Sequence, residues 1–378
     1  MKKYWRTGLL GAAAALIALS GCGKKTSVSE SRERDSWGFL NWTFTADGVL
    51  YRNPNPPRNG KAEYYDALSQ SYFPLCGRAN CLHKDDTCSA VHLNKAELLG
   101  QCGDRWYYLM NEEDGSLAFY SCSMDGSREK REGDFPHNNY GSVGTRALYT
   151  DHSCVYTAED VDLGTEQPVG EWYPEHWNSG IYQYQFDTKT EQVLVPAEAD
   201  VHMELIGKYE DKLLYRQSDE NSSVMGMLDL GTKEISHPMG KRFLTPVNSF
   251  HDGLLAGNLL ENDTRSIVEF NLETGEVNEI RTGLEQGARL YWSRDLKLIT
   301  EAEKSDSGIK YRTYQYGADG KQKLIREDEE GNCLEVMAVN NGMIYGELDL
   351  DGETVFKMAT ISLEDYLAGK SNWTVLEY

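Results

Sequence analysis

A short apolar strand that follows a polar turn recurs seven times along the chain. The turns are rich in Asp, Asn and Gly, and the strands are rich in Leu, Val, Ile and Tyr. The seven copies occupy residues 47–51, 103–108, 151–156, 210–215, 251–255, 294–299 and 340–345. Self-similarity at a regular spacing predicts a protein built from one repeated structural unit.

A second pattern follows each of these strands, in which apolar and polar residues alternate on both sides of a polar turn. Residues 267–280 show it best, with Thr274-Gly275 at the turn. Similar runs lie at 63–75, 118–128, 181–195, 224–235, 311–325 and 355–376. Alternation with a period of two around such turns is typical of antiparallel hairpins, so the pattern predicts an all-β protein.

The turns of successive copies lie 41 to 59 residues apart, a length that accommodates four short strands. A four-stranded unit cannot cover its own two faces, whereas units packed radially cover each other. We therefore predict a single seven-bladed β-propeller of four-stranded antiparallel blades. The expected blades are 36–95, 96–140, 141–200, 201–241, 242–285, 286–330 and 331–378. Tandem β-sandwiches or a β-solenoid are the alternatives.

The first 21 residues differ from the rest and are typical of an export signal. Lys2, Lys3 and Arg6 precede an apolar run at 9–19, which is short for a membrane span. The tetrapeptide that ends at Cys22 (Leu-Ser-Gly-Cys) resembles the bacterial lipobox, which implies cleavage before Cys22 and acylation of its thiol. A plain membrane helix is the alternative. We expect a signal at 1–21, a lipidated flexible tether at 22–35 and the propeller at 36–378, anchored in the cell membrane on its extracytoplasmic side.

The formal net charge of −22 becomes −25 when the three cations of the signal are removed. Such an excess of carboxylates repels phosphate backbones, so nucleic acid is not an expected partner. Metal ions, cationic ligands and basic proteins are compatible with this charge. A soluble, self-repelling surface is the simpler explanation of the same charge.

The signal, the polar tether and repeats such as Asp47-Gly48-Val49-Leu50-Tyr51 together resemble those of uncharacterised TolB-like β-propeller lipoproteins of anaerobic Gram-positive bacteria. The resemblance spans nearly the whole chain. It implies the propeller fold and a lipid anchor but no particular activity, because the shared motifs specify a fold.

Three cysteines and one histidine lie close together at Cys76, Cys81, His83 and Cys88. They could supply the four nitrogen and sulfur donors that zinc binds tetrahedrally, although the spacing is not a usual one. In an exported protein a disulfide is the rival interpretation. The cysteines beyond Cys22 number seven, so they cannot all pair within the chain. Zinc is thus a possible cofactor, and in either case the segment is expected to fasten a loop.

A second candidate site is the aromatic segment with Trp172, Tyr173, His176 and Trp177, which interrupts the strands of the third blade. Aromatic side chains on a projecting loop could stack against sugars or peptides, or could simply fold onto their own blade. The nearby acidic residues are Glu159, Asp160 and Asp162, which could meet this loop or lie in a solvated turn.

The sequence contains no nucleophile elbow, zincin helix, Walker loop or dinucleotide fingerprint. We therefore expect a binding or scaffolding module for a peptide, glycan or envelope protein before an enzyme. One alternative is a carbohydrate-active hydrolase or lyase with carboxylates on the propeller axis. The other is a zinc-dependent sensor that uses the Cys/His cluster.

Overall fold

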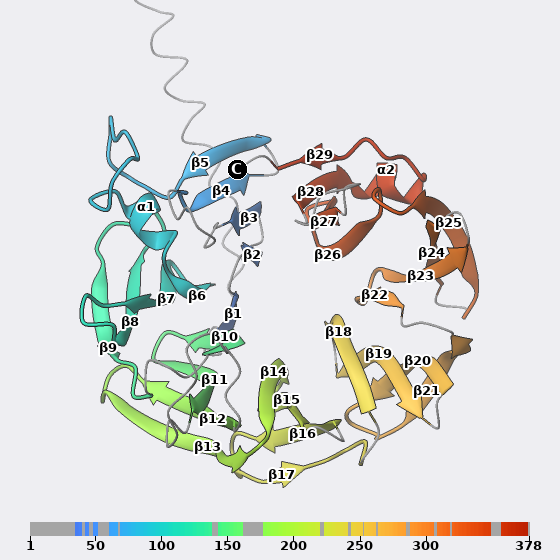
Figure 1. Cartoon of the computed structure of the whole chain (residues 1–378), viewed down its shortest axis with the longest axis horizontal. Helices are drawn as coiled ribbons and strands as arrows, with labels where there is room; N and C mark the ends of the chain where they lie inside the picture. Colours follow the sequence, from blue (N-terminus) through green and yellow to red (C-terminus); the bar gives the residue numbers. More distant parts are fainter. Residues whose placement is uncertain are drawn as a thin grey trace, which may run out of the picture. The chain divides into compact units, whose positions relative to one another are not determined.

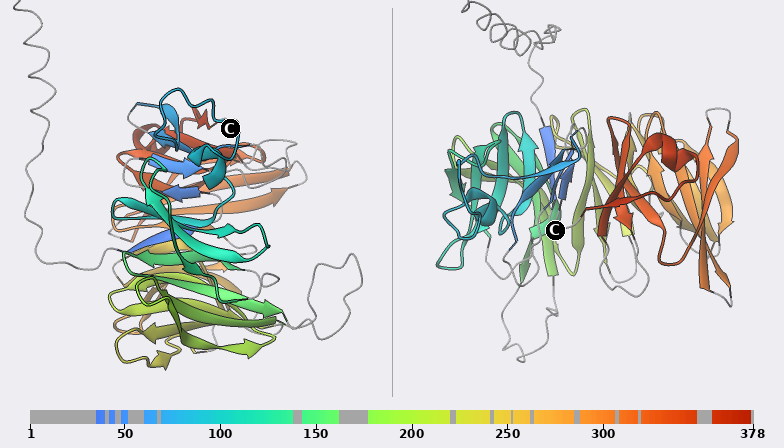
Figure 2. Two further views of the ribbon diagram at one scale, coloured as in Figure 1. Left: turned by 90° about the vertical axis from the view of Figure 1, so that its left-hand side faces the viewer. Right: turned by 90° about the horizontal axis from the view of Figure 1, so that it is seen from above.

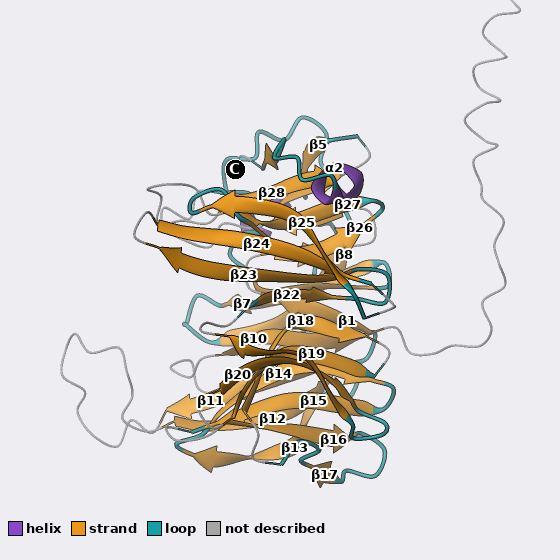
Figure 3. Ribbon diagram, turned by 90° about the vertical axis from the view of Figure 1, so that its right-hand side faces the viewer, coloured by secondary structure: helices purple, strands orange, loops and turns teal. Residues whose placement is uncertain are grey.

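Seven four-stranded antiparallel blades are arranged in a ring (Figure 1). The computed structural model describes residues 35–39, 42–44, 48–51, 60–66, 69–137, 143–161, 177–219, 223–240, 243–251, 253–261, 264–284, 288–305, 308–317, 320–348 and 357–376. Viewed from the side, the ring carries its hairpin turns on two opposite faces (Figure 2). Two short helices accompany the strands (Figure 3).

The first three blades each contain four strands. Blade 1 comprises β2 (Trp42–Phe44), β3 (Gly48–Tyr51), β4 (Glu63–Asp66) and β5 (Ser71–Pro74). Helix α1 (Ser89–Leu93) leads into blade 2, which comprises β6 (Glu97–Cys102), β7 (Arg105–Asn111), β8 (Leu117–Ser123) and β9 (Lys130–Asp134). Blade 3 comprises β10 (Val143–Thr150), β11 (Ser153–Val161), β12 (Trp177–Gln185) and β13 (Thr190–Ala199).

The remaining blades repeat this arrangement. Blade 4 comprises β14 (His202–Tyr209), β15 (Lys212–Ser218), β16 (Ser223–Asp229) and β17 (Ile235–Ser236). Blade 5 comprises β18 (Phe243–His251), β19 (Leu254–Glu261), β20 (Thr264–Asn271) and β21 (Val277–Leu284). Blade 6 comprises β22 (Arg289–Trp292), β23 (Lys297–Ser305), β24 (Gly308–Tyr316) and β25 (Gln322–Glu329). Blade 7 comprises β26 (Leu334–Asn340), β27 (Met343–Leu348), β28 (Lys357–Ser362) and β29 (Thr374–Val375), with α2 (Leu363–Leu367) between the last two strands.

The predicted fold, a seven-bladed propeller of four-stranded antiparallel blades, is confirmed. Each recurring turn and apolar strand in the sequence forms the second strand of a blade, as β3 and β27 illustrate. Five of the alternating runs form the hairpin of the third and fourth strands, as β20 and β21 illustrate. The run at 118–128 ends before β9, and helix α2 separates the two strands of the run at 355–376. The repeat in the sequence is therefore the blade itself.

Strand β7 shows how one blade packs against two neighbours. Trp106 and Tyr108 are fully buried in the apolar core shared with blade 1, whereas Tyr107 and Leu109 are buried in the core shared with blade 3. Successive side chains of a strand point to opposite faces of the sheet. Both faces of this strand are thus covered by adjacent blades, which explains its almost uninterrupted apolar sequence.

The ring closes by side-chain packing between blades 1 and 7. The four strands of blade 1 all lie between residues 42 and 74, and blade 7 is built entirely from the last four described strands, so the two blades exchange no described strand. Val49 and Tyr65 of blade 1 pack with Tyr345, Met358 and Leu376 of blade 7. The rings of Tyr65 and Tyr345 meet edge to face, with centroids 6.5 Å apart. Apolar side-chain packing therefore joins these two blades.

Strand β1 (Asp35–Phe39) corrects the predicted start of the first blade. It was expected within blade 1, but it pairs antiparallel with β10 of blade 3 along its whole length, from Asp35 opposite Thr150 to Phe39 opposite Arg146. A further pairing of Phe39 with Leu99 of β6 joins blades 2 and 3 into one nine-stranded sheet. The inner edge of a blade offers unpaired backbone groups, and these accept a strand regardless of its distance in the sequence.

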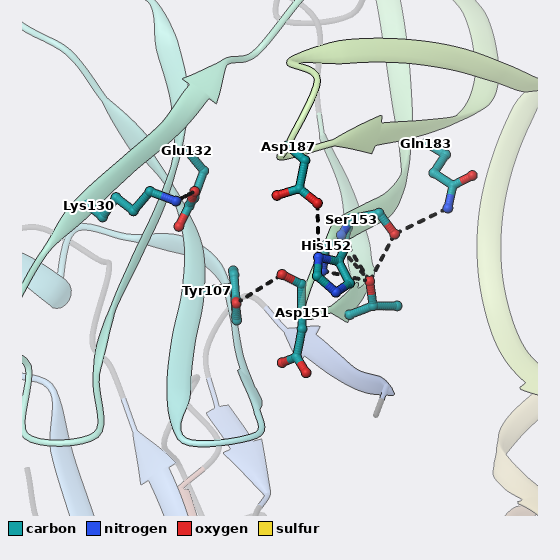
Figure 4. A network of polar contacts seen from close by, with 9 residues as sticks. Tyr107, Lys130, Glu132, Asp151, His152, Ser153, Gln183 and Asp187 are labelled. Atoms are coloured by element: carbon teal, nitrogen blue, oxygen red, sulfur yellow. Dashed lines mark hydrogen bonds and ion pairs between the residues drawn. The ribbon is translucent and has the colours of Figure 1, made fainter. Parts of the chain in front are cut away.

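A polar network lies at the seam between blades 2 and 3 (Figure 4). The Thr150 hydroxyl accepts hydrogen bonds from the backbone amides of His152 and Ser153, at 3.2 and 2.9 Å, and so fixes the turn between β10 and β11. Tyr107 of blade 2 donates to the carbonyl of Asp151 at 3.5 Å.

Within the described residues, no helix is both long and apolar enough to cross a membrane.

The C-terminal segment is fastened to blade 6 by a buried cation. Arg326 of β25 forms two hydrogen bonds of 2.6 Å with Asp328, and both side chains are almost completely buried. Its guanidinium also lies over the rings of Tyr366 and Trp373, 4.8 and 4.4 Å from their centroids. It donates to the carbonyl of Lys370 as well. One side chain thus holds α2 and the residues that follow it.

We expect Arg326→Leu to lower the free energy of unfolding by about 3–5 kcal/mol, because it leaves the Asp328 carboxylate buried without its partner. Urea denaturation measures the change. The double variant Arg326→Leu/Asp328→Leu should recover part of the loss. Arg312→Leu in β24, which removes an exposed ion pair with Glu327 of β25, should lower the free energy of unfolding far less than Arg326→Leu does. Equal losses for the two single variants would contradict the burial argument.

Candidate functional site

The Cys/His cluster lies in the connection from blade 1 to blade 2, between β5 and α1 (Figure 1). Cys76 lies two residues after the end of β5, and Cys88 is the residue that precedes the first turn of α1. The backbone amide of Gly77 donates to the carbonyl of Asp125 at 2.9 Å, which attaches the start of the connection to blade 2. The side chain of Asp85 accepts hydrogen bonds from Thr87 and shapes the turn before Cys88.

The structure brings all four predicted donors together. The sulfur atoms of Cys76, Cys81 and Cys88 and a ring nitrogen of His83 all lie within 4.8 Å of one another. His83 Nδ1 and Cys88 Sγ are 3.1 Å apart. Zinc bonds sulfur at about 2.3 Å and nitrogen at about 2.0–2.1 Å, so a tetrahedral site sets its donors roughly 3.5–3.8 Å apart. The four side chains therefore fit a zinc ion with only small adjustments.

The unusual spacing of the four donors is explained by the backbone. Asn80 and His83 both adopt a left-handed conformation, with φ of 61° and 52°. This conformation reverses the chain direction locally and is uncommon for residues other than glycine. The two reversals bring Cys81 and His83 back toward Cys76 and Cys88.

The environment of the cluster favours one ionised thiol. Burial raises the pKa of Cys76, but hydrogen bonds from the Arg78 amide, Ser89, Cys88 and Cys81 outweigh it and lower that pKa to about 7. Burial raises the pKa of Cys88. A bound divalent cation stabilises thiolates and would ionise the other thiols as well.

The four donors all come from the protein, which is the pattern of a structural zinc site rather than of a catalytic one. Every cysteine that the structure describes is a free thiol. Among the described residues, no other group of three or more His, Cys, Asp or Glu side chains comes together in this way.

The aromatic segment falls mostly outside the described residues. Trp172, Tyr173, His176 and Asp162 are not described, and of Trp177 the structure gives the backbone, which begins β12 and pairs with Val161. Glu159 is described: its buried carboxylate bonds to the imidazole of His202, on the first strand of blade 4. This partner was not predicted, because the two residues belong to different blades and are distant in the chain.

A pair of carboxyl groups near the inner strands was also not predicted. Glu335 of β26 lies directly opposite Glu347 of β27. Burial and the nearby Glu335 raise the pKa of Glu347, whereas Arg289 lowers it. Arg289 forms an ion pair of 3.3 Å with Glu335 and joins blade 6 to blade 7. We interpret this group as a structural contact between two blades.

No protein-family model and no curated protein sequence matches the chain. Solved structures do resemble it. An oligogalacturonate lyase from Vibrio parahaemolyticus aligns with a TM-score of 0.55 and 11% identity, covering 87% of this chain and 90% of that one. An oligogalacturonate lyase in complex with manganese gives 0.51 and 11%, covering 89% and 100%. TolB from Acinetobacter baumannii gives 0.39 and 13%, covering 85% and 76%. At these identities the likeness concerns the fold.

The His202–Glu159 pair makes stability depend on pH. The hydrogen bond to Glu159 raises the pKa of His202 against the effect of burial, and Glu204 adds to the rise while Arg216 opposes it. The stabilisation is therefore complete below the unfolded pKa of about 6.5 and is lost as pH rises through the higher folded pKa. Because the imidazole is half exposed, we expect a change below about 1 kcal/mol.

Urea denaturation at several pH values between about 6 and 8 measures this change. His202→Gln should flatten the dependence. His152→Gln removes an exposed imidazole that faces Asp187, and it should leave the wild-type slope in place. A wild-type slope in the His202 variant would contradict the assignment.

Proposed function

We propose that this protein is a lipid-anchored β-propeller that binds or scaffolds a partner outside the membrane. We further propose that zinc, held by Cys76, Cys81, His83 and Cys88, fastens the connection between its first two blades. The observation that carries the zinc assignment is the convergence of the four donor atoms within 4.8 Å.

The structural role of the metal follows from the donor set. Three thiolates and one imidazole fill the tetrahedral coordination of zinc, so no position remains for water or substrate. The connection from Cys76 to Cys88 contains no strand and packs against the core between blades 1 and 2 through Cys76, Cys81 and Cys88. A bound ion would replace the strand pairing that this segment lacks, and its binding energy would add to the stability of the fold.

The binding role is supported by the architecture and by the charge. A propeller provides a rigid ring on which connecting loops present side chains to a partner. The chain places an aromatic segment, Trp172 to Trp177, between the second and third strands of blade 3, and its net charge after export would be −25. Lipidation at Cys22 would hold this ring close to the membrane surface.

Protein purified without oxygen should contain one zinc ion per chain by elemental analysis. We expect Cys81→Ser or His83→Ala to lose most of the metal on dialysis against a chelator, because three ligands bind zinc far more weakly than four. Chelation should also lower the melting temperature of the wild type. Cys122→Ala removes a buried thiol outside the cluster and should retain the metal. A metal-free protein with a disulfide among Cys76, Cys81 and Cys88 would contradict the zinc site.

Cys22→Ala should abolish incorporation of labelled palmitate and release the protein from the membrane fraction, because the anchoring acyl chains attach to that thiol. Expression in a bacterium that processes lipoproteins, followed by fractionation, tests this expectation. Cys333→Ala serves as the control and should remain membrane-bound. Membrane retention of the Cys22 variant would indicate a membrane helix at 9–19 instead.

A further inference from the structure

A cavity of about 280 Å³ lies at the seam between blades 1 and 2, next to the Cys/His cluster. It is formed by β4, β5, β7 and the turn after β8. The residues that line it are Tyr64, Phe73, Pro74, Leu75, Cys76, Trp106, Met124 and Asp125. Its volume is close to the lower end of the range for small-molecule sites, about 300–1,000 Å³, so a compact ligand would fill it.

Three aromatic residues contribute to the wall. Trp106 is completely buried, and its indole nitrogen donates to the carbonyl of Met124 at 3.2 Å, which fixes the ring. Phe73 is 50% exposed, although it is a large apolar side chain. A fixed inner ring and an exposed outer ring are the features of an apolar site that remains open to solvent.

Asp125 supplies the one carboxylate among the described residues of this wall. Its Oδ1 atom accepts hydrogen bonds from the backbone amide and the hydroxyl of Ser127, at 2.9 and 2.6 Å. These hydrogen bonds lower the pKa of Asp125, so the carboxylate is charged at neutral pH. Gly77 packs against this carboxyl group, since a Cβ there would lie 2.5 Å from Oδ2.

We propose that this cavity binds a small organic ammonium ion, with the charged nitrogen beside Asp125 and the apolar part between Tyr64 and Phe73, in front of the buried ring of Trp106. This inference gives the proposed binding module a class of ligand and rests on that proposed function. Cys76 lines the cavity and is also a proposed zinc ligand, so the metal would hold one wall in place.

The residues that line the cavity favour a cation that also carries an apolar group. Aromatic faces attract an ammonium ion through their quadrupole, and more strongly where water is excluded. A carboxylate beside them favours a cation over a neutral molecule and repels an anion. The net charge of −22 attracts cations to the whole surface, so the neighbourhood of the cavity is enriched in them.

A charge series tests the proposal on the purified full-length protein with its metal content measured. Isothermal titration calorimetry compares phenethylammonium with the neutral phenethyl alcohol and the anionic phenylacetate. We expect the ammonium to bind about tenfold more tightly than the alcohol, and the anion not to bind. Nα-acetyl-lysine amide presents an ammonium as a basic protein would, and it should bind more weakly because it lacks a ring.

A matched pair of variants separates the site from general charge. Asp114 lies in blade 2 and accepts from Ser116 the same two hydrogen bonds, at 2.9 and 2.6 Å, but does not line the cavity. We expect Asp125→Asn to reduce the preference for ammonium over alcohol about tenfold, and Asp114→Asn to leave it unchanged. Phe73→Ala should weaken the binding of both ligands, and because Phe73 is exposed the variant should retain the fold.

Equal binding of phenethylammonium and the alcohol, or equal effects of the two Asp variants, would overturn the proposal. If Nα-acetyl-lysine amide binds more tightly than phenethylammonium, the ligand would be a basic protein and not a free small amine. The zinc content of the same samples is measured, so that failure of ligand binding can be distinguished from failure of the proposed zinc site. A protein that contains zinc but does not bind phenethylammonium would refute only the proposed class of ligand. A protein that binds phenethylammonium but contains no zinc would refute only the zinc site.

Discussion

The structure depends on the burial of both faces of every blade. Consecutive residues of β7 illustrate this constraint, because Trp106 and Tyr107 lie in two different apolar cores on opposite sides of one sheet. A single blade would expose both surfaces to water, so each blade requires two neighbours. A ring meets this requirement for all seven blades, and apolar side chains such as Tyr65 and Tyr345 pack where it closes, without an exchanged strand among the described ones.

The seam between blades 1 and 2 differs from the others because the chain leaves the strand pattern there. The connection from Cys76 to Cys88 carries the donor cluster on its own turns, while the adjacent strands form a cavity with an acidic residue at its wall. Cys76 belongs to both features. A metal in the cluster and a ligand in the cavity would therefore act on the same short segment, which couples the stability of the seam to its ability to bind.

The N-terminal strand gives the ring a second kind of connection. Strand β1 adds to the inner edge of blade 3 and touches blade 2, so backbone pairing reinforces a seam that elsewhere relies on side chains. The segment that precedes β1 is the polar one expected to reach the membrane. If the protein is anchored as proposed, the polar segment that leads to the lipid would leave the ring from its inner strands, where β1 pairs with β10.

The sequence by itself determined the fold, because the alternation of apolar and polar residues and the recurring turns are local patterns that do not depend on distant parts of the chain. Residues 267–280 are recognisable as a hairpin, and the four strands of each of the seven blades fall within the predicted ranges. It also identified Cys76, Cys81, His83 and Cys88, since their donors lie within one short segment. Tertiary structure alone decided the pairing of β1 with β10, the contact of Glu159 with His202 and the cavity beside Asp125. These features join residues that are distant in the chain, and their positions depend on how the blades pack rather than on any local pattern.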